Sequence, residues 1–226
     1  MSVATVTAKE VAKRDVPRIL IPLVVLQLVM IGLGVLLTHL LGDENGVNRS
    51  FAAHESGPLN AISEFFSLVG STPVIIAVCA VVAIILRLTL HRWPEPIFLC
   101  AAVSAQALIF LFTTLAIDRQ RPAVRHLDAS PPTSSFPSGH TSAAVALYGG
   151  LALILSSLVR RTYLKWICWL LVLVPVSVAL ARLYRGMHHP SDVASSFLNG
   201  FLCIAITWAA IVKPRGFRTR ERPASS

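Results

Sequence analysis

The chain has 226 residues, of which 54% are hydrophobic and only 14% are charged. A soluble domain of this size normally carries nearer a quarter charged residues, so the composition excludes an ordinary soluble protein and indicates a multi-pass membrane protein. The formal net charge of +9 does not indicate a nucleic-acid partner. The basic residues lie at the ends of apolar segments, where they orient a membrane protein instead.

Six apolar segments approach or exceed the length that crosses a bilayer. We therefore expect an all-α fold, a six-span transmembrane helix bundle with spans at about 18–41, 73–90, 96–117, 141–159, 164–184 and 193–212. The expected organisation is a cytoplasmic N-terminal tail over residues 1–17, one membrane domain over 18–212 and a basic cytoplasmic tail over 213–226.

A shorter amphipathic segment, residues 58–70, lies between the first two spans. Its apolar residues recur at helical spacing and oppose a polar face. The apolar set is Leu59, Ile62, Phe65, Phe66 and Val69, and the polar set is Asn60, Ser63 and Glu64. This pattern predicts a short interfacial helix between spans one and two, with a partly exposed loop as the alternative.

The basic residues predict the orientation of the bundle. Fourteen of the 20 Lys and Arg residues fall in the two tails and in the loops after the second and fourth spans, which six spans place on one membrane face. The positive-inside rule makes this face cytoplasmic, and we expect the plasma membrane. The six remaining basic residues are all arginines on the outer face: Arg49, Arg119, Arg121, Arg125, Arg182 and Arg185.

Two polar segments at helix starts predict an anion site on that outer face. Pro137-Ser138-Gly139-His140 opens the fourth span, and Pro190-Ser191-Asp192 opens the sixth, just after His188. Helix N-termini present free N–H groups and partial positive charge, so two that converge would hold an anion. Arg121 follows the third span and Arg182 ends the fifth, on the same face.

Each of these residues also has a purely structural interpretation. Ser138 alone would serve as an N-cap, Gly139 as a turn residue and Asp192 as a favourable charge in a first helical turn. Arg182 alone would extend to lipid headgroups. His140 and His188 would be hydrogen-bonded interfacial side chains. The combination, against the usual charge distribution, favours a functional site.

The residues resemble the motifs of the type 2 phosphatidic acid phosphatase family, membrane lipid phosphatases related to acid phosphatases and vanadium haloperoxidases. The family motifs are Lys-x6-Arg-Pro, Pro-Ser-Gly-His and Ser-Arg-x5-His-x3-Asp. Arg121-Pro122 matches the end of the first, 137–140 matches the second, and Arg182, His188 and Asp192 match the third. Thr114 replaces the lysine of the first motif, and Ala181 replaces the serine of the third.

The resemblance, together with the chemistry of the side chains, implies a role for each residue. His188 would attack phosphorus, Asp192 would orient its other ring nitrogen, and His140 would act as general acid and then as base. Arg121, Arg182, the Ser138 hydroxyl and the Gly139 N–H would hold the phosphate oxygens. The missing lysine raises the hypothesis that other arginines supply its charge: Arg119, Arg125 or Arg185.

We expect an integral-membrane phosphatase that hydrolyses a phosphomonoester or diphosphate of a lipid through a phosphohistidine. Polyprenyl diphosphate, phosphatidic acid and phosphatidylglycerophosphate all fit, with a preference for the first by analogy only. We expect no metal, because no carboxylate cluster suits Mg²⁺, and no other cofactor. The expected partners are the lipid substrate and the bilayer, and the oligomeric state stays open.

Three alternatives remain. A phosphotransferase would pass the same phosphoryl group to an acceptor hydroxyl instead of water. A non-catalytic lipid-binding relative is suggested by Thr114. A transporter would need ionisable groups near the middle of the membrane, where the spans carry few polar residues beyond Gln27 and Gln106.

Overall fold

The computed structural model describes residues 8–41, 44–130 and 132–212 of the chain. Residues 1–7 of the predicted N-terminal tail and the whole predicted C-terminal tail, residues 213–226, lie outside the described residues. The described residues form helices and connections without a β-strand, so the all-α prediction is confirmed.

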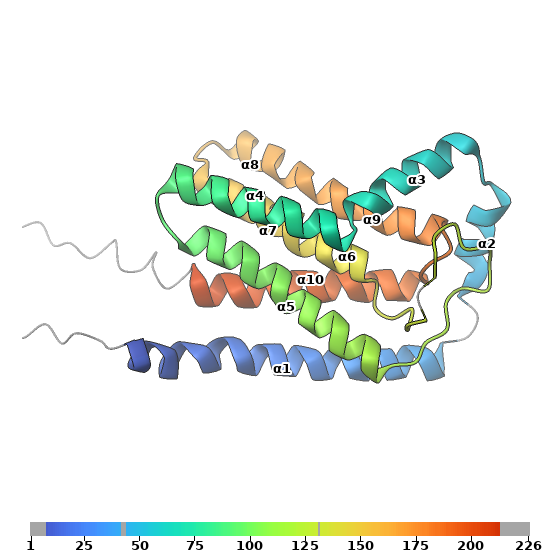
Figure 1. The fold of residues 1–226 in the computed structure, drawn as a ribbon, viewed down its shortest axis with the longest axis horizontal. Helices are drawn as coiled ribbons and strands as arrows, with labels where there is room; N and C mark the ends of the chain where they lie inside the picture. Colours follow the sequence, from blue (N-terminus) through green and yellow to red (C-terminus); the bar gives the residue numbers. More distant parts are fainter. Residues whose placement is uncertain (1–7, 42–43, 131, 213–226) are drawn as a thin grey trace, which may run out of the picture.

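The helices follow the order of the predicted segments (Figure 1). The first five are α1 (Ala8–Leu40), α2 (Asn45–Ala53), α3 (Gly57–Val69), α4 (Thr72–Leu90) and α5 (Pro94–Ala116). The fourth span consists of α6 (Gly139–Ala144), a π-helical turn (Val145–Gly149) and α7 (Gly150–Leu158). The last two spans consist of α8 (Thr162–Trp169), a 3₁₀ turn (Leu170–Val172), α9 (Leu173–Tyr184) and α10 (Pro190–Ile211).

Within the described ranges, 6 helical segments are long and apolar enough to cross a membrane. They run over Pro17–Leu40, Thr72–Leu90, Pro94–Ala116, Gly139–Leu158, Thr162–Tyr184 and Pro190–Ile211. The six-span prediction is therefore confirmed, with small differences at the ends. Prolines in the first turns of α3, α4, α5 and α10 favour these starts, because the first helical N–H groups need no partner within the helix.

Helix α5 lies at the centre of the packing. It packs against α1, α4 and α10, and two apolar clusters fill the space between them. Phe98 and Leu99 of α5 are fully buried in the first cluster, and Met30 of α1 is fully buried in the second. Large apolar side chains on the outside of the bundle stay exposed, as a surface that faces lipid requires.

The two helices α2 and α3 lie at one end of the bundle, beside the C-terminal ends of α5 and α9 and the N-terminal ends of α6 and α10 (Figure 1). Helix α1 begins, and α10 ends, at the opposite end. The predicted helix over 58–70 is confirmed as α3. Its serines Ser63 and Ser67 are buried against the protein, while Ile62 and Phe65 are exposed. Helix α2 is a new feature that the sequence did not predict.

Candidate active site

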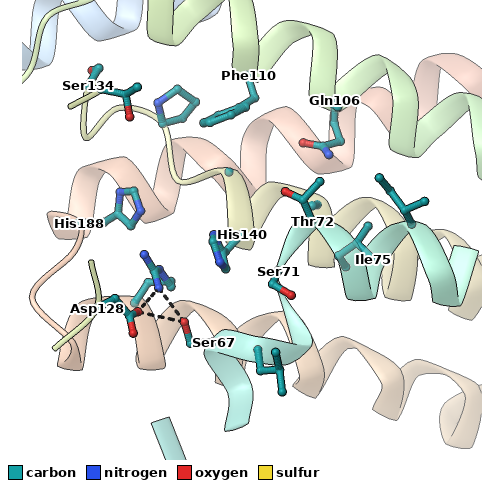
Figure 2. Close-up of a pocket in the computed structure, with 18 of the residues that line it drawn as sticks. Ser67, Ser71, Thr72, Ile75, Gln106, Phe110, Asp128, Ser134, His140 and His188 are labelled. Atoms are coloured by element: carbon teal, nitrogen blue, oxygen red, sulfur yellow. Dashed lines mark hydrogen bonds and ion pairs between the residues drawn. The ribbon is translucent and has the colours of Figure 1, made fainter. Parts of the chain in front are cut away.

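A cavity of about 940 Å³ opens at the end of the bundle that carries α2 and α3. Its walls come from α3, α4, α5, α6 and α9, and from the long connection between α5 and α6. Five of the residues that the sequence pointed to line it together: Arg121, Gly139, His140, Arg182 and His188. Figure 2 shows His140 and His188 facing the same space. The structure thus brings together groups from four separate parts of the chain.

Polar and apolar walls divide this cavity. The arginines and histidines line one part, whereas Ile75 and Ile76 of α4 and Val103, Ala107 and Phe110 of α5 line another. Figure 2 shows Ile75 and Phe110 on the side of the cavity away from Asp128. A ligand with a charged head and an apolar chain matches this division.

His188 lies in the short connection between α9 and α10. Gly186 turns the chain there with a positive φ of 70°, a conformation that costs glycine little. The Asn48 amide of α2 donates hydrogen bonds to the carbonyl oxygens of Leu183, at 2.9 Å, and His188, at 3.1 Å. Helix α2 therefore holds the backbone of the α9–α10 connection in place through these two hydrogen bonds.

The hydrogen bond at His188 Nδ1 sets which ring nitrogen is available. Nδ1 lies 2.7 Å from the carbonyl oxygen of Ser135. A carbonyl oxygen only accepts, so Nδ1 carries the proton of the neutral ring and Nε2 keeps its lone pair. Burial lowers the pKa of His188 well below its ordinary value, and the charges of Arg182 and Arg121 lower it further. The neutral, nucleophilic form is therefore favoured.

Asp192 does not make the direct hydrogen bond to His188 that the sequence led us to expect. Its Oδ2 lies 4.0 Å from Nδ1, and the carbonyl oxygen of Ser135 takes that proton instead. The reason is local: Asp192 closes a capping box at the start of α10 and accepts the backbone N–H of His189 at 2.8 Å. Its other oxygen accepts from Arg119.

Arg121 and Arg182 each present an unpaired donor. The Nη1 of Arg121 donates to the carbonyl oxygen of Met187 at 2.8 Å, and the Nη1 of Arg182 donates to Ser67 at 2.6 Å and to Asp128. Within the described residues, the Nε atoms of both arginines are buried and have no hydrogen-bond partner. Buried N–H donors of charged groups are normally satisfied, so these two guanidinium groups, which line the cavity, have donor capacity left for an anion.

The two residues before His140 differ in their surroundings. Ser138 is fully buried; its N–H donates to the Ser196 hydroxyl at 2.7 Å, and its own hydroxyl lies 3.0 Å from that of Thr141. Gly139 lines the cavity itself. A Cβ at this position would lie 2.9 Å from the Phe110 ring, so the glycine lets the ring pack against the start of α6.

The three further arginines proposed to replace the motif lysine are engaged elsewhere. Arg119 pairs with Asp192 and with Glu44, and Arg185 pairs with Asp128 at 2.7 Å. Arg125 is 77% exposed and lies 3.7 Å from Glu55. Among the described residues, the cavity lining includes none of these three arginines. Thr114 also lies outside that lining, with its hydroxyl 3.5 Å from the carbonyl oxygen of Phe136.

Sequence reasoning missed Asp128, which lines the cavity and holds two arginines at once. Figure 2 shows Asp128 beside Ser67, with dashed lines for the hydrogen bonds among Asp128, Ser67 and Arg182. Burial alone would raise the pKa of Asp128, but the hydrogen bond from Arg185 and the charges of Arg182 and Arg185 hold it below its ordinary value. A carboxylate in the connection between two motifs on an arginine-rich face was the available signal.

Fold and cavity together define a multi-pass membrane protein with a cavity lined by arginine and histidine side chains. Residues 95–215 match the family model described as the PAP2 superfamily, and the chain belongs to this superfamily. The recognised resemblance to type 2 phosphatidic acid phosphatases is thereby confirmed.

One relative is similar in sequence, and two solved structures are similar in fold. The chain is 36% identical over 86 residues to a probable diacylglycerol pyrophosphate phosphatase 1 of Schizosaccharomyces pombe, a match over 35% of this chain and 31% of that protein. The fold is similar to that of a transmembrane PAP2 type phosphatidylglycerolphosphate phosphatase from Bacillus subtilis, with a TM-score of 0.72, 19% identity and coverage of 90% and 99%. Aquifex aeolicus LpxE gives a TM-score of 0.56, 24% identity and coverage of 72% and 92%.

Proposed function

We propose that this protein is a lipid phosphate phosphatase that cleaves a phosphomonoester or diphosphate of a membrane lipid through a phosphohistidine on His188. One observation carries the proposal: His140, His188, Arg121 and Arg182 line a single cavity, and the Nε of each arginine has no hydrogen-bond partner among the described residues. Its apolar wall between α4 and α5 supports a substrate whose alcohol is anchored in the membrane.

The first step forms the bond between His188 and phosphorus. The lone pair on Nε2 attacks phosphorus while the bond from phosphorus to the lipid oxygen breaks, and His140 gives its proton to that leaving oxygen. Arg121 and Arg182 hold the remaining phosphate oxygens, where negative charge accumulates. The hydrogen bond from Nδ1 to the Ser135 carbonyl keeps the ring oriented while it becomes positive.

The second step returns the protein to its starting state. His140, now neutral, takes a proton from a water molecule whose oxygen attacks phosphorus, and the bond from phosphorus to Nε2 breaks. Phosphate leaves, and both imidazoles regain their initial protonation. We propose that no metal is required, because the two guanidinium groups supply the positive charge that phosphoryl transfer needs.

The roles of the other predicted residues are also proposals. Gly139 borders the cavity, and its N–H at the start of α6 would contact a phosphate oxygen. Ser138 would act by holding the start of α6 to α10, through its N–H to Ser196. Asp192 would supply negative charge near His188 and cap α10.

We propose further that the site faces the outside of the cell membrane, with both termini in the cytoplasm. The support is the charge distribution along the sequence, in which most Lys and Arg fall in the tails and near the α4–α5 and α7–α8 connections, and these two connections lie at the end of the bundle opposite α2 and α3. A polyprenyl diphosphate remains our preferred substrate, beside phosphatidic acid and phosphatidylglycerophosphate. The preference rests on the analogy with the recycling of a polyprenyl carrier lipid.

The test is phosphate release by the purified protein from a panel of these lipid phosphates, with His188→Gln as the matched control. We expect release from at least one lipid by the unmodified chain and none by the variant. Release that is equal in both would contradict the nucleophile, and the appearance of a phosphorylated alcohol in place of free phosphate would indicate a phosphotransferase.

A further inference from the structure

A row of three charged side chains, two buried and one partly buried, lies beside His188 and, among the described residues, outside the cavity lining. Arg119 is at its centre: its Nη2 donates to Glu44 at 2.7 Å, and its Nη1 donates to Asp192. The side chains of Arg119, Glu44 and Asp192 are 8%, 17% and 0% exposed. They come from the connection after α5, the connection between α1 and α2, and the first turn of α10.

Glu44 binds Ser191 as well as Arg119. Its Oε1 accepts from the Ser191 hydroxyl at 2.8 Å, and its Oε2 accepts from the Ser191 backbone N–H at 3.1 Å. Burial alone would raise the pKa of Glu44, but the hydrogen bonds from Ser191 and Arg119 hold it below its ordinary value. Glu44 is therefore charged at neutral pH, and it fixes the start of the helix that carries Asp192.

The charges of this row do not cancel. Two carboxylates and one guanidinium leave one net negative charge on this side of His188. Arg182 from α9, Arg121 from the α5–α6 connection and His140 from α6 face the ring from the cavity. Without Glu44, Arg119 would neutralise Asp192 alone, and this row would carry no net negative charge; in the cavity, Asp128 pairs with Arg182.

We propose that Glu44 is a positioning residue for the nucleophile. Glu44 binds Arg119, so that the negative charge of Asp192 is not fully neutralised and continues to act on His188. This inference rests on the proposed phosphohistidine chemistry, and Glu44 belongs to none of the three sequence motifs. The ring becomes positive as the bond from Nε2 to phosphorus forms, and a nearby net negative charge stabilises that state more than the neutral one. Charges in such a buried site are weakly screened, so the effect reaches the ring through Asp192.

The predicted signature separates the chemical step from phosphate binding. Among the described residues, Glu44 is not part of the cavity lining, so its loss leaves the contacts to bound phosphate in place. For Glu44→Gln we expect kcat to fall about 10-fold per folded molecule, the effect of one charge-assisted hydrogen bond, with KM changed by less than about 2-fold. Glu44→Asp keeps the charge and should recover most of kcat.

Glu55→Gln is the matched control. Glu55 lies at the same end of the bundle and is 20% exposed, but among the described residues its ion-pair partner is the exposed Arg125, at 3.7 Å. Activity of this variant should equal that of the unmodified chain. If Glu44→Gln matches Glu55→Gln in kcat, or if Glu44→Asp is as slow as Glu44→Gln at equal folded content, the inference is wrong.

A binding measurement keeps this inference separate from the proposed activity. Vanadate adopts the five-coordinate geometry of the attack on phosphorus, whereas inorganic phosphate does not. Measured by ⁵¹V NMR and by phosphate competition, Glu44→Gln should weaken vanadate binding about 10-fold and phosphate binding by less than about 2-fold. If this pattern is found in a protein that releases no phosphate, the proposed phosphatase activity is wrong but the inferred role of Glu44 stands. If Glu44→Gln weakens the binding of both anions equally, only the inferred role of Glu44 is wrong.

Discussion

The Nδ1 atom of His188 lies 2.7 Å from the carbonyl oxygen of Ser135, and this relationship joins the second and third motifs. The donor belongs to the connection before α10, and the acceptor lies just before Pro137, where α6 is about to begin. A backbone acceptor cannot lose its position through side-chain rotation, so the ring orientation depends on the folding of the whole α5–α6 connection.

The first prediction concerns His188→Gln. Glutamine fills a similar volume and retains a donor for Ser135, but it offers no nucleophilic nitrogen, so phosphate release should fall by at least about 10³-fold. The protein should elute normally in detergent and bind inorganic phosphate. His54→Gln is the control, because His54 is exposed at the end of α2 and its ring lies 2.8 Å from the Ser50 carbonyl oxygen of that helix, away from the cavity lining of the described residues. Turnover that survives in His188→Gln would assign the nucleophile elsewhere.

The second prediction concerns Arg121→Lys. Lysine keeps the positive charge but has no Nε–H beside a terminal fork, so one hydrogen bond to the substrate is lost. We expect kcat/KM to fall about 10- to 100-fold, the range for a hydrogen bond to a charged group. Steady-state kinetics on one lipid phosphate measures this.

Arg125→Lys provides the comparison for that measurement. Arg125 lies on the same connection but is 77% exposed, and it should tolerate the change with kcat/KM unaltered. A fall in Arg125→Lys as large as that in Arg121→Lys would mean that the charge of this connection matters more than the geometry of Arg121.

The third prediction concerns Gly186, which turns the chain before His188 with a φ of 70°. A Cβ at Gly186 would lie 2.6 Å from the backbone oxygen of Arg125, so Gly186→Ala combines backbone strain with a clash. We expect a loss of about 1–3 kcal/mol in unfolding free energy and a loss of turnover, because the His188 connection must shift.

Gly46→Ala is the opposite case. Gly46 lies in α2, and no atom lies within 4 Å of the position of its added Cβ among the described residues. Alanine should stabilise this helix by about 0.5–1 kcal/mol without altering turnover. Thermal unfolding in detergent measures both variants, and equal shifts of Tm in the two would refute the assigned difference.

The spans could be predicted because the signal for a bilayer-crossing helix is local in the sequence: an uninterrupted series of apolar residues between polar ends. The sequence also predicted the meeting of Arg121, Arg182, His140 and His188, since all four lie at span ends on one face. A topological argument was sufficient there. It required no knowledge of which helix packs against which.

The partners of these residues could not be predicted in the same way. Asn48, Glu44 and Asp128 lie in connections or in a short helix, where polar residues show no informative period, and each bonds to a residue far along the chain. The role of the Ser135 carbonyl oxygen cannot be predicted from the residue type, because every residue has a backbone carbonyl. The resemblance and the chemistry of His–carboxylate pairs led us to expect that Asp192 orients the His188 ring, but the cap of α10 occupies one of its oxygens and Arg119 the other.

The fourth prediction is a pH dependence of stability that originates in His188. Its pKa in the folded protein is lowered by burial and by the charges of Arg182 and Arg121, whereas in the unfolded chain it stays near 6.5. Below about pH 6.5 the unfolded chain therefore binds a proton that the folded protein does not, and stability falls by at most about 1.4 kcal/mol for each pH unit. Above that pH the full contribution is present. Thermal unfolding of the unmodified protein and of His188→Gln, between pH 8 and pH 5.5, should show the unmodified protein losing more stability on acidification. Parallel curves would mean that His188 titrates normally in the folded state, and that its neutral, nucleophilic form is not prepared by the surrounding structure.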